Sequence, residues 1–201
     1  ESQGGMHPWR DAVDLDAGVG PGSTSVARGD AVSVQFRPGQ TGLVRIDHDR
    51  PALMRWRAAS TERRLSPHGK AYFALLGRGG ALDLSPVDGA STVSWQLLPG
   101  VSLEDGVVAR QWLGPGESRL FSIVLEERAL VGIGVRGSHG LPTVELLGAD
   151  GQRITAGTLM RESLAKGTYW VLATTPNEAP PQWIHAAIVG SKRPVDGPPD
   201  A

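Results

Sequence analysis

The chain contains no cysteine, so no disulfide links its segments and no thiol serves as a nucleophile or a metal ligand. It also lacks any run near the roughly 18 apolar residues of a spanning helix. Strong charge of one sign is missing too, because 20 basic and 21 acidic residues give a formal net charge of −1. Its densest basic stretch, residues 55–64, is interpreted as an exposed strand and loop. We therefore expect no nucleic-acid partner and no membrane span.

Recognisable catalytic motifs are absent as well. The sequence has no G-x-S-x-G nucleophile turn and no phosphate loop, and GIGVRG at residues 132–137 fails the dinucleotide spacing and lies in an expected strand. His48 lies between Asp47 and Asp49, but strand alternation sends it to the opposite face, so a hairpin end is the preferred interpretation. We expect a protein that is not an enzyme and has no catalytic residue.

The histidines also fail to suggest a metal site. None has a second histidine or a cysteine at the spacing of zinc ligands, and the five are scattered along the chain: His7, His48, His68, His139 and His185. We therefore expect no bound metal and no cofactor.

Turn-forming residues are abundant. The 27 glycines and 15 prolines make up more than a fifth of the 201 residues, and they separate short apolar runs. Such punctuation every 8 to 12 residues or so is typical of β-sandwiches and barrels rather than helical bundles. The composition therefore predicts an all-β protein.

An internal repeat is visible between residues 27–46 and residues 114–133. The two stretches align without a gap, and the Gly–acid turn at Gly29 falls on the one at Gly116. In both, apolar residues alternate along a strand, a polar connection follows, and a second strand begins. The sequence thus predicts two tandem antiparallel β-sandwich domains, jelly-roll-like and related by this repeat, although two similar amphipathic hairpins would give the same pattern by chance.

Domain limits follow from the repeat. We expect an N-terminal segment or linker at 1–25, a first sandwich at 26–100, a linker at 101–113, a second sandwich at 114–190, and a Pro-rich linker at 191–201. Residues 6–17 are expected to form one short helix within the first of these segments.

Each copy is expected to close with a turn and a strand, at residues 87–97 in the first and 165–173 in the second. In the second, neither alternating face is plainly polar, which predicts a central strand. Trp95 and Trp170 near the ends of these strands are expected to be buried.

The order of features in the second copy resembles the bacterial pre-peptidase C-terminal domain, a small β-sandwich of secreted and cell-surface proteins. The similarity covers about residues 114–174: a Gly-rich turn at Gly116, a leucine-rich strand running into Asp150-Gly151, and the A-K-G-T-Y segment that ends at Tyr169. The resemblance implies a non-catalytic accessory or binding module. Members often carry aspartates before the leucine-rich strand that can hold calcium, whereas this chain has LPTVE at 141–145, so calcium binding is not inferred.

Tryptophan is common for the number of other aromatics, with 6 Trp against 3 Phe and 2 Tyr. A tryptophan offers a flat apolar surface together with one hydrogen-bond donor, which suits sugar and peptide binding. Trp112 and Trp183 lie beside Gly/Pro-rich loops, QWLGPG and PPQWIH, and are the predicted binding residues.

Three functions remain open. The first is a non-catalytic scaffold or protein-interaction segment of a larger secreted, periplasmic or cell-surface bacterial protein, whose partner is another protein or a neighbouring domain. The second is a carbohydrate-binding module with a glycan as ligand, and the third is a hydrolase whose active-site residues are dispersed along the chain.

Overall fold

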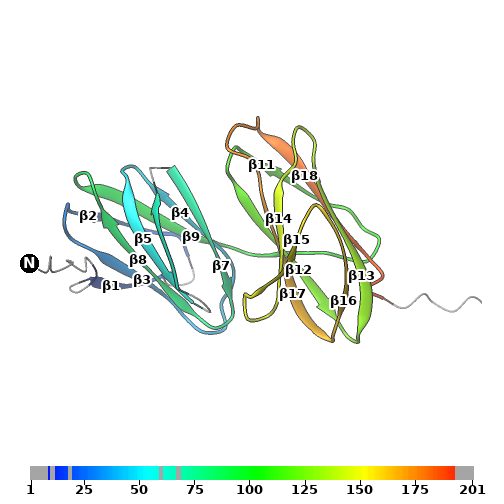
Figure 1. The fold of residues 1–201 in the computed structure, drawn as a ribbon. Helices are drawn as coiled ribbons and strands as arrows, with labels where there is room; N and C mark the ends of the chain where they lie inside the picture. Colours follow the sequence, from blue (N-terminus) through cyan, green and yellow to red (C-terminus); the bar gives the residue numbers. More distant parts are fainter. Residues whose placement is uncertain (1–8, 10–11, 18–19, 59–60, 67–68, 193–201) are drawn as a thin grey trace, which may run out of the picture. The chain divides into compact units, whose positions relative to one another are not determined.

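The structure, a computed structural model, describes residues 9, 12–17, 20–58, 61–66, 69–192. Within these ranges the chain forms strands β1 to β18 and no helix (Figure 1). No described helix is therefore a candidate for crossing a membrane. The chain divides into two compact units, residues 1–99 and 100–201.

The described part of the first unit contains nine strands: β1 (Val13–Asp16), β2 (Gly22–Val26), β3 (Val32–Phe36), β4 (Thr41–His48), β5 (Ala52–Arg57), β6 (Thr61–Ser66), β7 (Gly69–Leu76), β8 (Gly80–Pro86) and β9 (Ser91–Leu98). They form a five-stranded sheet of order β1-β3-β8-β5-β6 and a four-stranded sheet of order β2-β9-β4-β7.

The second unit repeats this plan: β10 (Val101–Ser102), β11 (Ala109–Leu113), β12 (Ser118–Leu125), β13 (Ala129–Gly137), β14 (Thr143–Leu147), β15 (Arg153–Ala156), β16 (Leu159–Leu164), β17 (Gly167–Thr174) and β18 (Gln182–Val189). Its sheets have the orders β10-β12-β17-β14-β15 and β11-β18-β13-β16. Each position in these orders is occupied by the strand nine places later than in the first unit.

The pairing within each unit is that of a rolled-up long hairpin. In the first unit β2 pairs with β9, β3 with β8, β4 with β7 and β5 with β6, all antiparallel, and successive pairs alternate between the two sheets. The second unit does the same with β11 and β18, β12 and β17, β13 and β16, and β14 and β15. This is the jelly-roll arrangement of a double-sheet sandwich. The predicted fold class, an all-β chain with two tandem antiparallel sandwiches, is confirmed.

Each unit has its own hydrophobic core. Alternation along the strands sends every second side chain between the two sheets, as with Val44 and Ile46 on β4 or Val131 and Ile133 on β13, all fully buried. In the first core, Trp56 stacks on Phe73 at 5.3 Å between ring centroids and meets the edge of Phe36 at 5.7 Å. Gly29 and Gly116, the aligned turn glycines, both have positive φ, at 86° and 65°.

Four strands lie in segments that we expected to be linkers or a helix. Val13–Asp16 forms β1, which pairs in parallel with β3 rather than being helical, and Gly22–Val26 forms β2. The expected interdomain linker, 101–113, contains β10 and β11. These segments lack a clear alternation of apolar and polar residues, so the sequence did not predict strands there. Their backbone N–H and C=O groups form hydrogen bonds with strands distant in sequence, and composition does not show such pairing.

The strands that we matched at the ends of the two copies are not equivalent. The strand at 167–174 is β17, the counterpart of β8, whereas β9 with Trp95 corresponds to β18. Both segments have a glycine-containing turn before an apolar strand, and this shared local pattern caused the mismatch. The prediction of a central strand is confirmed, because β17 lies between β12 and β14.

The burial of Trp95 and Trp170 is confirmed, at 6% and 7% exposure. Trp95 belongs to the first core. Trp170 lies on the face of β17 turned away from the second core, because its neighbours Tyr169 and Val171 face that core. Its ring is covered by Gly100, where an added Cβ would lie 2.9 Å from Cζ3 of Trp170.

Candidate functional site

Trp112 and Trp183, the two predicted binding residues, form a pair. They are direct partners in the antiparallel register of β11 and β18, and their ring centroids lie 5.3 Å apart at an interplanar angle of 66°. Their neighbours Leu113 and Ile184 point into the core, so both tryptophans point outward. The exposed fractions of Trp112 and Trp183 are 55% and 46%. The structure thus brings together on one sheet two residues far apart in sequence.

A row of three basic side chains lies next to this pair. In the register, His185 on β18 is flanked by Arg110 on β11 and by Arg136 on β13. Burial of the imidazole, together with the charges of Arg110 and Arg136, lowers the pKa of His185 below its ordinary value. Its Nδ1 is buried and has no hydrogen-bond partner among the described residues. These contacts favour the neutral form of His185 in the free protein.

The loop after β13 fixes the backbone of Trp183. Ser138 N donates to Trp183 O at 3.0 Å, and Trp183 N donates to Ser138 Oγ at 3.2 Å. His139 N donates to Oε1 of Gln182, which is fully buried, at 2.9 Å. These bonds anchor the loop beside the tryptophan pair.

The same sheet face carries several apolar side chains beyond the basic row, together with Arg161 on β16. Gly132 and Gly134 on β13 alternate with core residues and so turn outward, and an added Cβ on them would meet Val189 at 3.0 Å and Leu159 at 4.0 Å. Leu159 and Val189 are 84% and 56% exposed, and Leu130 is 52% exposed. We call this outward side of the β11-β18-β13-β16 sheet, with its five large apolar side chains, the tryptophan face; the five are Trp112, Trp183, Leu130, Leu159 and Val189.

The first unit has polar residues at the positions of the tryptophan pair. Strands β2 and β11 are equivalent, and each ends with a buried residue, Val26 or Leu113. When these two residues are aligned, the register places Ser25 and Thr92 where the second unit has Trp112 and Trp183. The jelly roll therefore does not require an exposed tryptophan pair at these positions.

The same comparison holds for the basic row. By register, Ser23, Ser94 and Asp47 of the first unit take the positions of Arg110, His185 and Arg136. The fold does not need three basic side chains there either.

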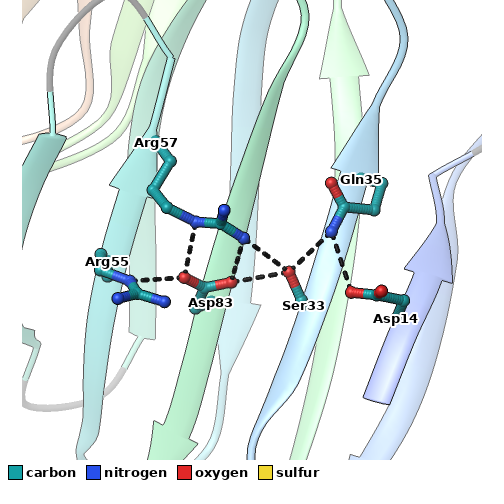
Figure 2. Close-up of polar contacts among 6 residues, drawn as sticks. All are labelled: Asp14, Ser33, Gln35, Arg55, Arg57 and Asp83. Atoms are coloured by element: carbon teal, nitrogen blue, oxygen red, sulfur yellow. Dashed lines mark hydrogen bonds and ion pairs between the residues drawn. The ribbon is translucent and has the colours of Figure 1, made fainter. Parts of the chain in front are cut away.

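A polar cluster on the five-stranded sheet of the first unit is the second candidate (Figure 2). Asp83, which is 1% exposed, accepts from Ser33 Oγ at 2.6 Å and from Arg55 Nε at 2.6 Å. Arg57 donates to both carboxylate oxygens, at 2.9 Å each. Gln35 extends the cluster, because its Nε2 donates to Ser33 Oγ and to Asp14 Oδ1.

This cluster satisfies itself internally. Burial acts to raise the pKa of Asp83, but the hydrogen bonds from Arg57, Ser33 and Arg55 outweigh it and hold the pKa below its ordinary value. Asp83 is thus a poor general base, and the Ser33 hydroxyl is already donated to it. We assign the cluster a structural role. It also shows that Arg55 and Arg57 of the basic stretch are partly buried ion-pair partners.

His48 and Ser66 form a buried serine–histidine contact. Nδ1 of His48 donates to the Arg50 carbonyl at 2.8 Å, which leaves Nε2 to accept from Ser66 Oγ at 3.0 Å. His48 is 4% exposed and Ser66 8%, so substrate has no access to the pair. His48 points away from Asp47, which binds Arg45, and from Asp49, which binds Ser91.

A depression of about 650 Å³ in the second unit is lined by acidic residues that include Glu104, Asp105, Glu126 and Glu127. Backbone N–H groups of Ser191 and Lys192 donate to Asp105 at 3.4 and 3.2 Å. Nowhere in the described residues do three His, Cys, Asp or Glu side chains converge to hold a metal ion.

No family model matches this chain, and no curated protein matches it. Among solved structures it is similar to a conserved protein of unknown function from Pseudomonas aeruginosa PAO1, at 17% identity, TM-score 0.26 and coverage of 85% of this chain and 79% of the other. It is also similar to YhaK from Escherichia coli (11%, 0.29, 84% and 84%) and to a triple jelly-roll turret protein of an archaeal virus (10%, 0.26, 85% and 55%). TM-scores this low say nothing about function.

Proposed function

We propose that this chain is a non-catalytic protein-interaction segment of a larger extracytoplasmic bacterial protein, and that the tryptophan face is its docking surface. The observation that supports this most directly is the concentration of exposed apolar side chains on one sheet. Exposed apolar side chains gathered on one surface mark interaction sites, whereas single scattered ones are ordinary.

The composition of the face suits a protein partner. Tryptophan and arginine are the residues most enriched among binding hot spots, and Trp112, Trp183, Arg110 and Arg136 lie side by side in the register. The side chain of Leu159 is 84% exposed. Its burial against an apolar surface of a partner would therefore contribute favourable free energy to binding.

A comparison of the two units shows that the fold does not require the tryptophan pair. The first unit builds the same sheet with Ser25 and Thr92 in place of the tryptophan pair. The exposed tryptophan pair of the second unit is therefore not a by-product of the jelly roll. The resemblance of residues 114–174 to the pre-peptidase C-terminal domain supports an extracytoplasmic location for the protein.

Affinity capture from the native envelope fraction tests the proposal. Three immobilised chains are compared: wild type, Trp112→Ser/Trp183→Thr, and the control Val124→Ser, which removes a side chain 66% exposed on β12 of the other sheet. One protein should be retained by wild type and Val124→Ser and be lost from the double variant. Equal recovery by all three, or recovery of cytoplasmic enzymes only, would contradict the proposal.

A carbohydrate ligand is the second candidate, and the exposed tryptophan pair is the observation that favours it. An edge-to-face pair leaves part of each indole free to stack on a sugar ring. Titration with a glycan panel, followed by tryptophan fluorescence, distinguishes the two. A saturable shift that disappears in Trp112→Ser/Trp183→Thr would favour the glycan over the protein partner.

A further inference from the structure

The outward strand positions of the tryptophan face carry basic groups but no acidic ones. Strand alternation places Arg110, Arg136, Arg161 and His185 at outward positions of its four strands, and no Asp or Glu occupies an outward position there. The three arginines have no ion-pair partner among the described residues. A partner that supplies carboxylates to this face would complement these charges.

We propose that the partner is an acidic protein surface, which places a carboxylate on the row Arg110–His185–Arg136 while its apolar side chains cover the tryptophan pair, and that His185 takes up a proton when this carboxylate binds. This inference rests on the docking role proposed above and specifies the chemistry of the partner.

The register explains why the row suits a carboxylate. The three residues occupy adjacent strands, which lie about 4.8 Å apart, so the outer two flank the imidazole on both sides. Guanidinium groups bind carboxylates with two parallel N–H donors. A single carboxylate over His185 is therefore within reach of donors from both arginines.

Like charges argue against a second copy of the chain as the occupant. An isologous dimer through this face would bring the arginines of both copies into one interface. Without carboxylates on either side, the repulsion would have no compensation. A partner with acidic groups removes this cost.

The proton uptake follows from the groups that face His185. Arg110 on β11 and Arg136 on β13 both disfavour the imidazolium, and its neighbours on β18, Trp183 and Ala187, are uncharged. On the loop after β13, His139 is bonded to Ser138 Oγ through Nδ1. A bound carboxylate reverses the local field, so the pKa of His185 rises and binding strengthens as the pH falls from about 7.5 to about 5.5.

Short poly-L-glutamate is the probe for this proposal. Its binding to the full chain is measured by NMR from the indole N–H signals of Trp112 and Trp183 and from the ring signals of His185, with oligogalacturonate as a second anion. We expect poly-L-glutamate to bind about tenfold tighter at pH 5.5 than at 7.5 and to weaken with salt, and the pKa of His185 to rise on binding.

Matched variants assign the effect to the row. Arg110→Gln/Arg136→Gln should weaken binding about tenfold, whereas Arg161→Gln, which removes one charge elsewhere on the same face, should leave the His185 response intact. His185→Gln should bind without the pH dependence. A His185 signal that does not respond to poly-L-glutamate, equal effects of Arg161→Gln and the double variant, or tighter binding of oligogalacturonate would each overturn the proposal. The capture experiment above tests docking itself and is unaffected by these outcomes.

Discussion

Trp112 and Trp183 are direct cross-strand partners, with ring centroids 5.3 Å apart and about half of each side chain exposed. Their register equivalents in the first unit are Ser25 and Thr92. A single chain thus presents the same fold with and without an aromatic pair, so each unit is an internal control for the other.

Trp112→Ser/Trp183→Thr should therefore leave the second unit folded. The expected loss in the free energy of unfolding is below the value of about 3 to 5 kcal/mol for a buried tryptophan, because about half of each indole is already exposed. Thermal melts followed by circular dichroism measure this. A loss of about 3 kcal/mol or more would mean that the pair maintains the fold rather than a docking surface.

Trp170→Ala should have a much larger effect. Trp170 is 7% exposed on the central strand β17, and Gly100 lies against its ring, so its removal leaves a cavity. We expect the second unit to lose about 3 to 5 kcal/mol of stability. Melts of this variant beside Trp112→Ser/Trp183→Thr give the comparison, and an unchanged Tm for Trp170→Ala would refute the burial of this side chain.

Acid should destabilise the first unit through Asp83. The folded-state pKa of Asp83 lies below the value of about 3.9 in an unfolded chain. Its contribution to stability is therefore fully present above about pH 4 and is lost as the pH falls through the folded pKa.

Asp83→Ala should remove this contribution at every pH. It should lower the free energy of unfolding by about 2 kcal/mol at pH 7, because Arg55 and Arg57 lose their carboxylate partner. Arg57 is 44% exposed, so water replaces part of its lost hydrogen bonding. Urea unfolding at several pH values measures both effects, with the exposed Asp88→Ala as control. Identical acid sensitivity of wild type and Asp83→Ala would contradict the assignment.

Gly22→Ala should destabilise the first unit. Gly22 is the cross-strand partner of Trp95, and an added Cβ would overlap the buried indole ring. Overpacking of this kind typically costs about 1 to 3 kcal/mol. Gly20→Ala is the matched control, since an added Cβ there meets nothing within 4 Å. Equal melting temperatures for the two variants would show that Trp95 moves aside freely.

The fold class was predictable because alternation and turn residues are local signals. Val34 and Phe36 on β3, aligned with Phe121 and Ile123 on β12, already indicated two similar units. Strands β1 and β10 were not predictable, because both are short and have no clear pattern of apolar residues. They form through parallel pairing with β3 and β12, which lie elsewhere in the sequence.

The candidate site was predictable only in part. Trp112 and Trp183 were identified from the high tryptophan content of the chain and from the Gly/Pro-rich loops beside them. No local sequence feature showed that they are cross-strand partners. The row Arg110–His185–Arg136 had no signal, because its members come from three separate strands that only the jelly-roll register brings together. The strand expected at GIGVRG is β13, but only the structure shows that Gly132 and Gly134 lie on the tryptophan face.

Site-specific photo-crosslinking in cells that produce the native protein tests the docking surface most directly. A benzoylphenylalanine replaces Leu159 on the tryptophan face or, as control, its register equivalent Tyr72 in the first unit. The account predicts a discrete protein adduct from position 159 and none from position 72. No adduct from 159, or equal adducts from both positions, would contradict the claim that the tryptophan face binds a protein partner.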